Sequence, residues 1–176
     1  MSATKWKLDP VHSEIGFKVR HMMLTNVSGK FQNFSGFIER TEDSFDKAVF
    51  SFTGEVNSIT TGNEERDAHL LSADFFNAEE FPEMVFVSTS FTKINDKEFE
   101  LTGDFTIHGI TKTLKLEAAF EGINKDPWGN TRAGFTLNGK MHRKHWNLNW
   151  NSLLETGGMM VGEEVALSIQ LQFIKE

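Results

Sequence analysis

The sequence predicts an all-β fold made mainly of antiparallel strands, with a single short helix. Two observations carry this prediction. Apolar and polar residues alternate with a period of two in segment after segment, and one segment, residues 63–76, departs from that alternation. The chain has 176 residues, which suits a single domain spanning 1–176 that buries a sizeable core without disulfides.

The strands follow from the alternation. In segment 164–173 every second residue is apolar, namely Val165, Leu167, Ile169, Leu171 and Phe173. Segments 12–20 and 112–121 show the same pattern, which is typical of a strand with one face in water. The further strand candidates are 26–39, 47–57, 84–93, 98–107 and 131–142. We therefore expect about eight strands, joined by turns such as 95–97 and 126–130.

The segment 63–76 (NEERDAHLLSADFF) predicts a helix of two to three turns. Asn63 suits the N-cap, and Glu64 and Glu65 suit the first turn, where the helix dipole favours negative charge. Antiparallel strands with one helix are typical of a β-sandwich or a closed barrel. The alternation does not decide between the two. A closed barrel of eight strands has an interior that side chains fill or that one small ligand occupies.

Composition excludes several kinds of site. The net charge of −7 disfavours binding to nucleic acid, because phosphate backbones are negative. The chain has no Cys, so disulfides, thiolate metal sites and Cys nucleophiles are excluded. It has 17 Phe and no Tyr, and Phe has no hydroxyl that needs a partner when it is buried. Such a composition suits a dry, lined interior, although an ordinary Phe-packed core explains it more simply.

The sequence has no run of about 18 apolar residues, so we expect no integral membrane segment. The N-terminal residues 1–13 contain no apolar stretch of the kind found in secretory signals. We therefore expect a cytoplasmic protein, or a periplasmic one if a signal has been removed.

Motifs for catalysis or metal binding do not occur. The six histidines form no HxH or HExxH pair, and His142 and His145, three residues apart near a strand end, are not placed as a helix would place them. There is no GxSxG nucleophile motif, P-loop or GxGxxG. We expect no catalytic residue, no metal site and no covalent cofactor.

Polar groups that could contact a ligand lie at the predicted strand ends and in the helix. Arg20 and His21 end one strand, Arg66 is followed by Asp67, and Arg143 ends another strand. A guanidinium matches the geometry of phosphate and carboxylate groups, so each arginine either contacts a ligand head group or ties the chain together. For Arg66 the structural interpretation is favoured. Met22, beside Met23, offers adaptable apolar surface for a flexible tail, or simply fills a gap.

An ordered set of motifs resembles the YceI-like family, and the resemblance runs from Trp6 to Phe173. The motifs are residues 8–13 (LDPVHS), 17–22 (FKVRHM), 27–31 (VSGKF), 58–63 (SITTGN), 103–112 (GDFTIHGITK), 148–151 (LNWN) and 155–158 (ETGG), with Arg66-Asp67 and His69-Leu70 between them. Any one motif is weak, but the set in this order is specific. One departure concerns the residues after Arg143, where the family usually has an acidic residue and then an aromatic residue and glycine. Here residues 144–147 read KHWN.

The resemblance implies a lipocalin-like, antiparallel eight-stranded barrel, capped by a short helix around 63–76. It also implies an elongated cavity that takes an isoprenoid quinone, a polyprenyl lipid or another long-chain amphiphile, a homodimer, and no established catalysis. With the strand pattern, it gives the candidate ligand-binding residues Phe17, Arg20, His21, Met22, Phe31, Arg66, Phe105, Arg143, Trp150, Leu167, Ile169 and Leu171.

The function expected from the sequence is therefore binding or carriage of a long-chain lipid or isoprenoid in the barrel. Two alternatives remain. The first is a barrel enzyme acting on a small apolar substrate, with His21 or His69 as base. It needs a carboxylate or hydroxyl that converges on the imidazole. The second is a structural dimer whose barrel is filled by its own side chains.

Overall fold

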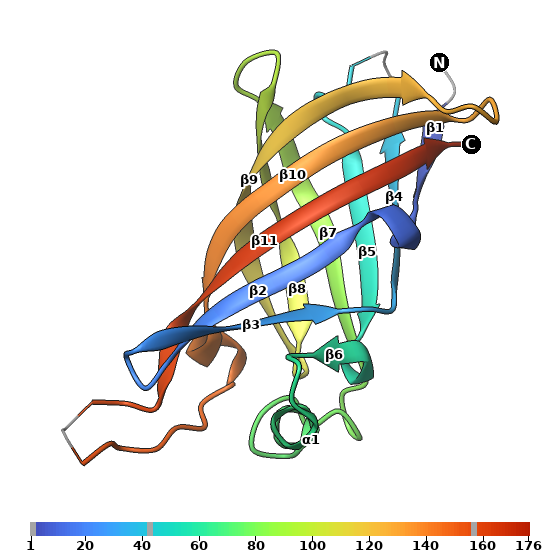
Figure 1. Ribbon diagram of the computed structural model, residues 1–176. Helices are drawn as coiled ribbons and strands as arrows, with labels where there is room; N and C mark the ends of the chain where they lie inside the picture. Colours follow the sequence, from blue (N-terminus) through green and yellow to red (C-terminus); the bar gives the residue numbers. More distant parts are fainter. Residues whose placement is uncertain (1–2, 42–43, 156–157) are drawn as a thin grey trace.

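The computed structural model describes residues 3–41, 44–155 and 158–176, and it is a barrel of long, twisted strands (Figure 1). One α-helix is present among these residues, α1 (Glu64–Leu71), together with the short 3-10 helices η1 (Pro10–His12), η2 (Val56–Ser58) and η3 (Arg143–Trp146). The strands are β1 (Thr4–Leu8), β2 (Glu14–His21), β3 (Thr25–Phe31), β4 (Phe34–Arg40), β5 (Val49–Glu55), β6 (Ile59–Thr60), β7 (Glu83–Lys93), β8 (Glu98–Ile107), β9 (Ile110–Lys125), β10 (Thr131–His142) and β11 (Val161–Lys175).

Eight strands close the barrel, in the order β1-β4-β5-β7-β8-β9-β10-β11, with β11 pairing back onto β1. Every pairing is antiparallel, which confirms the expected fold class. One edge of strand β11 pairs with β10, and its other edge is shared by two partners. Its end pairs with β1 (Leu8 opposite Phe173), and its middle pairs with β2 (Ile15 opposite Ile169). Strands β2, β3 and β6 therefore continue the sheet away from the closed barrel (Figure 1).

Most predicted strands are present, and the differences have local causes. The segment 26–39, predicted as one strand, is two, because the chain turns at Gln32 and Asn33. There the Gln32 amide donates to the carbonyl of Ser58, and the Asn33 carbonyl accepts from the amide of Glu55. The sequence interpretation also missed β1 and the two-residue β6. A strand of two residues such as β6 is too short to show an alternation of apolar and polar residues.

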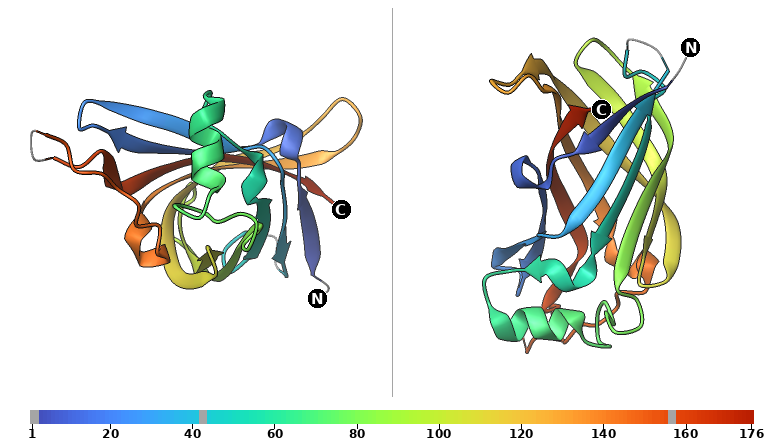
Figure 2. Two further views of the ribbon diagram at one scale, coloured as in Figure 1. Left: turned by 90° about the horizontal axis from the view of Figure 1, so that it is seen from below. Right: turned by 90° about the vertical axis from the view of Figure 1, so that its right-hand side faces the viewer.

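Helix α1 (Glu64–Leu71) lies within the predicted segment 63–76 and has the predicted length of two to three turns. The Asn63 side chain accepts a hydrogen bond from the amide of Arg66 (2.9 Å), so Asn63 is the N-cap. The helix ends at Leu71, and Ser72 caps it by donating its hydroxyl to the carbonyl of His69 (2.6 Å). Residues 73–76, the rest of that segment, form a turn. The whole segment lies across one end of the barrel, which we call the capped end (Figure 2).

The opposite end, the closed end, is filled by aromatic rings. Phe91 stacks on Phe99 with ring centres 4.5 Å apart, and Phe135 packs edge-on against Phe50 and Phe45. Such geometries add a favourable quadrupole interaction to the burial of apolar area. Much of the Phe-rich, Tyr-free composition therefore serves an ordinary packed core at this end.

A partly buried ion-pair network also ties the closed end together. Arg132 on β10 donates to Asp126 in the β9–β10 turn (2.8 Å) and to Asp9 beside η1 (2.7 Å). The hydrogen bond from Arg132 lowers the pKa of the Asp126 carboxyl from 3.8 to about 2. Burial raises the pKa of Asp9, but hydrogen bonds from His12 and Arg132 outweigh it and leave that pKa below its usual value. Both carboxylates therefore stay ionised well into the acid range.

This network predicts a loss of stability in acid. A carboxyl whose folded pKa lies below its unfolded value stabilises the fold when ionised. The contribution of Asp126 is thus complete above about pH 4 and disappears as the pH falls toward 2.

We expect Arg132→Met to lower the melting temperature at pH 6 and to flatten its fall between pH 4 and pH 2. Thermal melts at four pH values measure this. Lys93→Met, which removes an exposed pair with Asp96, is the control. An unchanged slope in Arg132→Met would contradict the assignment.

Candidate functional site

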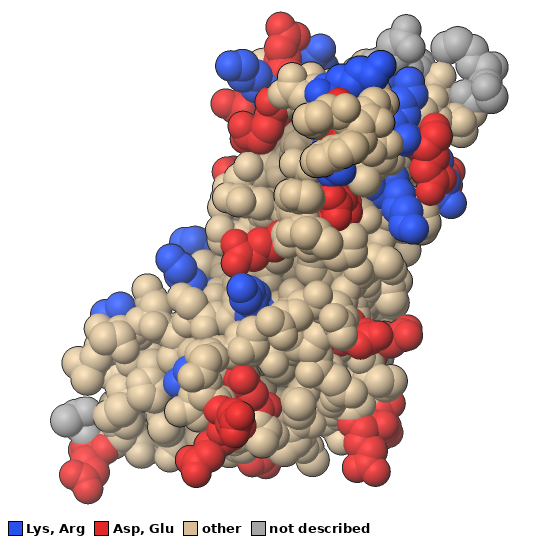
Figure 3. All heavy atoms as spheres, turned by 45° about the vertical axis from the view of Figure 1, so that its right-hand side comes forward, with Lys and Arg blue, Asp and Glu red and all other residues tan. Residues whose placement is uncertain are grey.

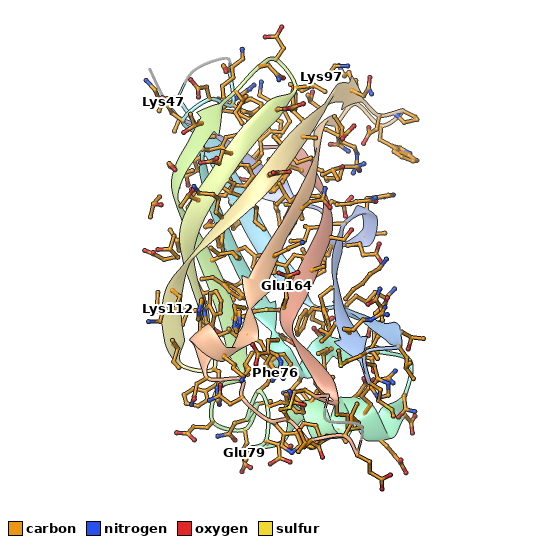
Figure 4. The ribbon with its side chains drawn as sticks, turned by 90° about the vertical axis from the view of Figure 1, so that its left-hand side faces the viewer. Lys47, Phe76, Glu79, Lys97, Lys112 and Glu164 are labelled. Carbon is orange, nitrogen blue, oxygen red and sulfur yellow. The ribbon has the colours of Figure 1, made fainter. Side chains whose placement is uncertain are left out.

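A cavity of about 560 Å³ occupies the capped half of the barrel. Its walls are almost entirely aliphatic and aromatic, and Phe50 and Phe173 form its deep end, toward the packed aromatic core. Its rim, toward α1, contains the exposed residues Arg20, Asn63 and Glu65. Figure 4 shows Phe76, another lining residue, at the base of the barrel, with Lys47 and Lys97 at the far end. The barrel is therefore packed at one end and hollow at the other.

The alternating pattern of β11 places one wall of this cavity. Val165, Leu167, Ile169 and Leu171 all line it, and the strand runs from the rim toward the closed end. This is the geometry expected of a barrel strand, in which every second side chain points inward.

The next part of the cavity wall is formed by β2, and its shape depends on a glycine of β3. Phe17 of β2 lies directly opposite Gly29 of β3. A Cβ added at Gly29 would lie 2.4 Å from the Phe17 ring, so the ring rests on the bare backbone of β3. The glycine thereby fixes an aromatic side chain of the lining, and any larger residue at position 29 would displace it.

Most of the candidate ligand-binding residues line this single cavity. The apolar ones are Phe17, Phe31, Phe105, Trp150, Leu167, Ile169 and Leu171, and the charged or titratable ones are Arg20, His21, Arg66 and Arg143. The structure places Met22 outside the lining. It lies in the β2–β3 turn with a left-handed backbone (φ 51°), and 39% of its surface is exposed.

Arg143 is a buried structural residue, although it also borders the cavity. Its side chain is 3% exposed and donates to four main-chain carbonyls, those of Gly162 (2.7 Å), Leu148 (2.6 Å), Trp150 (3.0 Å) and Val161 (3.2 Å). Burial lowers the pKa of this guanidinium, and the nearby charge of Glu163 partly opposes that effect. The arginine therefore joins η3, the following loop and the start of β11, and it pairs directly with no carboxylate among the residues that the structure describes.

The departure from the family pattern after Arg143 is accommodated locally. Asn147 occupies the left-handed position that ends η3 (φ 59°), a conformation that Asn adopts more readily than most residues. Its amide donates to the carbonyl of Lys144 (3.0 Å).

Arg66 and Asp67 anchor α1 to the end of β6. Arg66 donates from Nε to the Thr61 hydroxyl and from Nη2 to the Thr61 carbonyl, both at 2.7 Å. Asp67 accepts from the Thr61 amide at 2.9 Å. These contacts favour the structural interpretation of the Arg-Asp pair, which holds the helix over the capped end.

Arg20 and His21 remain available at the rim. Arg20 has one hydrogen bond, from Nη2 to the carbonyl of Met23 (3.2 Å), and the His21 ring makes none within the part of the chain that the structure describes. Since Arg66 and Arg143 are engaged with the protein, these two residues are the best placed to meet the polar end of a ligand.

The sequence interpretation missed a pair at the same rim. His69 Nε2 and Asp74 Oδ2 are 2.8 Å apart, and the imidazole lies edge-on to the rings of Trp150 and Phe75. Had the helix continued to residue 76, a spacing of five would have set these side chains on different faces. The helix ends at Leu71, and the turn brings Asp74 back to His69.

Within residues 3–41, 44–155 and 158–176, no three His, Asp or Glu side chains form a group that could hold a metal ion. His142 and His145 lie outside the cavity with their rings stacked 4.8 Å apart, and His142 pairs with Glu163 at 3.2 Å. In the same ranges no helix has the length and apolar character needed to cross a membrane.

Comparison with known proteins places the chain in a family. The model of the YceI-like domain matches residues 6–173. The UPF0312 protein SAS2572 of Staphylococcus aureus strain MSSA476 is 34% identical over 171 residues, which cover 97% of each chain. The UPF0312 protein SERP2314 of Staphylococcus epidermidis is 36% identical over 173 residues, again 97% of each chain.

Solved structures share the fold. BcnA of Burkholderia cenocepacia has a TM-score of 0.81 at 19% identity, with 94% of this chain and 98% of that one covered. The YCEI protein of Campylobacter jejuni has a TM-score of 0.76 at 29% identity, with 89% and 90% covered. A polyisoprenoid-binding domain from Saccharophagus degradans has a TM-score of 0.74 at 12% identity, with 97% and 98% covered. From the domain match and the identity to its relatives, the chain belongs to the YceI-like family.

Proposed function

We propose that this protein binds one long-chain apolar or amphiphilic molecule and holds its tail in the barrel. The observation that carries the proposal is the 560 Å³ cavity, lined by apolar side chains and ending against a packed aromatic core. An apolar tail in such a cavity is removed from water along its whole length, which is the main source of affinity for a ligand of this kind. The polyisoprenoid-binding description of the Saccharophagus degradans domain supports isoprenoids as the ligand class.

The cavity volume suggests a tail length. A water molecule occupies about 30 Å³ of liquid, and taking a methylene group as similar in size gives room for roughly 20 carbons. Four isoprene units contain that number of carbons. At about 0.3 kcal/mol per atom the tail supplies ~6 kcal/mol, a dissociation constant of tens of micromolar before any head-group contact. Longer tails leave their remainder outside the rim.

The rim supplies polar contacts for the other end of the molecule. Arg20 and His21 lie there with few protein partners, as described above, and His69 lines the same opening. A guanidinium and an imidazole suit a quinone carbonyl or a phosphate. We therefore place the head group of an isoprenoid quinone or polyprenyl phosphate at this rim.

The enzyme alternative meets one of its requirements, because Asp74 is the carboxylate that His69 needed. We do not propose catalysis from this pair. Both side chains are solvent-accessible, at 39% and 53%, and their contacts with the end of α1 and with Trp150 account for their position. A filled barrel without ligand is disfavoured by the cavity itself.

A tail-length series tests the proposal. Delipidated protein is titrated with quinones that carry one to eight isoprene units, and bound ligand is quantified by mass spectrometry after organic extraction. We expect one ligand per chain and roughly a tenfold gain in affinity per added unit, since five carbons at about 0.3 kcal/mol each give ~1.5 kcal/mol. The gain should level off beyond four units. No uptake of quinones, polyprenols or fatty amides, together with no lipid extracted from the native protein, would refute the proposal.

A further inference from the structure

Two loops beside the rim carry exposed apolar side chains. One is the β2–β3 turn, where Met23 is 64% and Leu24 71% exposed, and the other precedes β11, where Leu153 is 71% exposed. Both loops project from the same side of the capped end (Figures 1 and 2). We define the apolar lobe as Met22, Met23, Leu24, Leu153 and Met159.

The lobe is held in shape by the main chain. The Met22 amide donates to the carbonyl of Met160 (2.7 Å), which joins the two loops. Within the second loop, the Met160 amide donates to Ser152 (2.9 Å) and the Leu154 amide to Gly158 (2.7 Å). The apolar side chains are therefore presented on an ordered surface, which lowers the entropy lost when they bind a partner.

The turn residues run against the local backbone preference. Met22 and Met23 both have a left-handed backbone, with φ of 51° and 59°. Asn and Gly adopt this conformation far more readily than Met, and they dominate turns in which two successive residues have positive φ. The sequence thus places two large apolar side chains where the turn itself would be more stable with Asn and Gly. Strained residues of this kind concentrate at functional sites.

The lobe adjoins the opening of the cavity. His21 and Met160, each next to a lobe residue in the chain, both line the cavity, and Val161 pairs with His21 across the strands. A surface that covers the lobe would therefore also face the rim through which a tail must enter.

The place of the lobe, beside the opening of the cavity, favours a lipid surface over a second copy of the chain, because a copy seated there would cover the rim through which a tail enters. At the observed exposures, its five residues present roughly 500 Å² of surface, comparable to the largest patch on many monomers. A stable protein interface buries about 800 Å² on each partner, a little over half of it apolar, so the area of the lobe alone fits either partner. A lipid bilayer sets no such minimum, because individual side chains enter its interfacial region.

The charged residues around the lobe indicate whether a neutral or an anionic bilayer suits it. The lobe residues are uncharged, but Glu155 and the acidic first turn of α1 (Glu64, Glu65, Asp67) lie at the same end. In Figure 3 acidic groups outnumber basic ones toward this end, whereas both kinds are mixed toward the closed end, and in Figure 4 Glu79 lies at the base, away from Lys47 and Lys97. An anionic surface would therefore repel the capped end.

From these observations we propose that the apolar lobe docks the protein on a neutral phospholipid surface, so that the cavity opens toward the lipid. The docking site is a hydrophobic contact rather than an electrostatic one. This inference rests on the proposed function for its purpose, since a lipid-binding barrel must exchange its ligand with a membrane. The contact itself is measured without any ligand.

Cosedimentation with phosphatidylcholine vesicles tests the docking. The informative variant is Met22→Asn with Met23→Gly, which removes apolar surface while giving the turn its preferred residues, so the melting temperature should hold or rise. We expect wild type to bind independently of salt and more weakly when anionic lipid is added, and the variant to bind at least tenfold more weakly. Ile94→Ser, at an equally exposed position (62%) in the β7–β8 turn, is the control and should bind like wild type.

The remaining outcomes separate this inference from the proposed function. Uptake of a four-isoprene quinone from cyclodextrin should be the same in the variant and in wild type, whereas transfer from vesicles should slow at least tenfold in the variant. Failure of wild type to bind neutral vesicles, with normal uptake from cyclodextrin, would overturn the docking and leave the binding function intact. A concentration-dependent dimer in sedimentation velocity that the variant abolishes, without vesicle binding by wild type, would assign the lobe to a second copy instead.

Discussion

Replacing Arg143 with Met should lower the free energy of unfolding by about 3–5 kcal/mol, because several buried hydrogen bonds from a charged donor are lost at once. The guanidinium donates to four carbonyls on two segments, the loop after η3 (Leu148, Trp150) and the start of β11 (Val161, Gly162). Methionine fills much of the volume but donates no hydrogen bond, so these buried acceptors lose their partner. Urea unfolding followed by tryptophan fluorescence measures the change.

Two further variants make this result specific to Arg143. Arg143→Lys keeps the charge, but one ammonium cannot replace a planar fork that reaches four acceptors, so we expect it to recover less than half of the loss. Arg66→Met removes two hydrogen bonds at a partly exposed site and should cost about 1–2 kcal/mol. If Arg143→Met stays within 1 kcal/mol of wild type while ligand affinity falls, Arg143 is a head-group contact and its structural assignment is wrong.

The strand framework could be predicted because it depends on a repeating local signal. In β11 the alternation of Leu167, Ile169 and Leu171 with polar residues identifies both the strand and the side chains that face the interior. Asn63 likewise marks the start of α1, because an N-cap is a contact within one helical turn. These features are set by residues close together in the sequence.

The roles of the charged residues could not be predicted in the same way. The partners of Arg143 are main-chain carbonyl oxygens up to 19 residues away. Every residue has such a carbonyl, so the sequence does not show which of them an arginine contacts. The His69–Asp74 pair depends on where α1 ends within the segment 63–76, and the sequence pattern did not locate that end. Such contacts are consequences of the assembled fold.

Composition was ambiguous for a similar reason. The abundance of Phe fits a packed core and a lined cavity equally well, and the barrel contains both. Phe91 and Phe135 fill the closed end, whereas Phe17 and Phe105 line the hollow end. The strand pattern alone does not distinguish them, because inward-facing residues of both kinds alternate identically along their strands.

Two substitutions of the same kind separate the hollow end from the packed end. Ile169 lines the cavity midway along β11, whereas Ile38 of β4 is completely buried and lies outside the cavity lining. We expect Ile169→Trp to keep its stability within about 1 kcal/mol of wild type, because the larger ring enters open space. Ile38→Trp should lose about 1–3 kcal/mol, since a close-packed core accepts a larger ring only by forcing its neighbours out of favourable rotamers.

For ligand affinity the order of the two variants should be reversed: Ile169→Trp loses affinity and Ile38→Trp keeps it. The indole of Ile169→Trp takes the space of the tail, so affinity for a four-isoprene quinone should fall at least tenfold, or about 1.4 kcal/mol. A quinone with one isoprene unit ends nearer the rim, before the new ring, and should bind almost normally. Ile38→Trp, assayed under conditions in which it is folded, should bind both quinones like wild type. If Ile169→Trp is as destabilised as Ile38→Trp and takes up the long quinone unchanged, the tail does not occupy this part of the barrel.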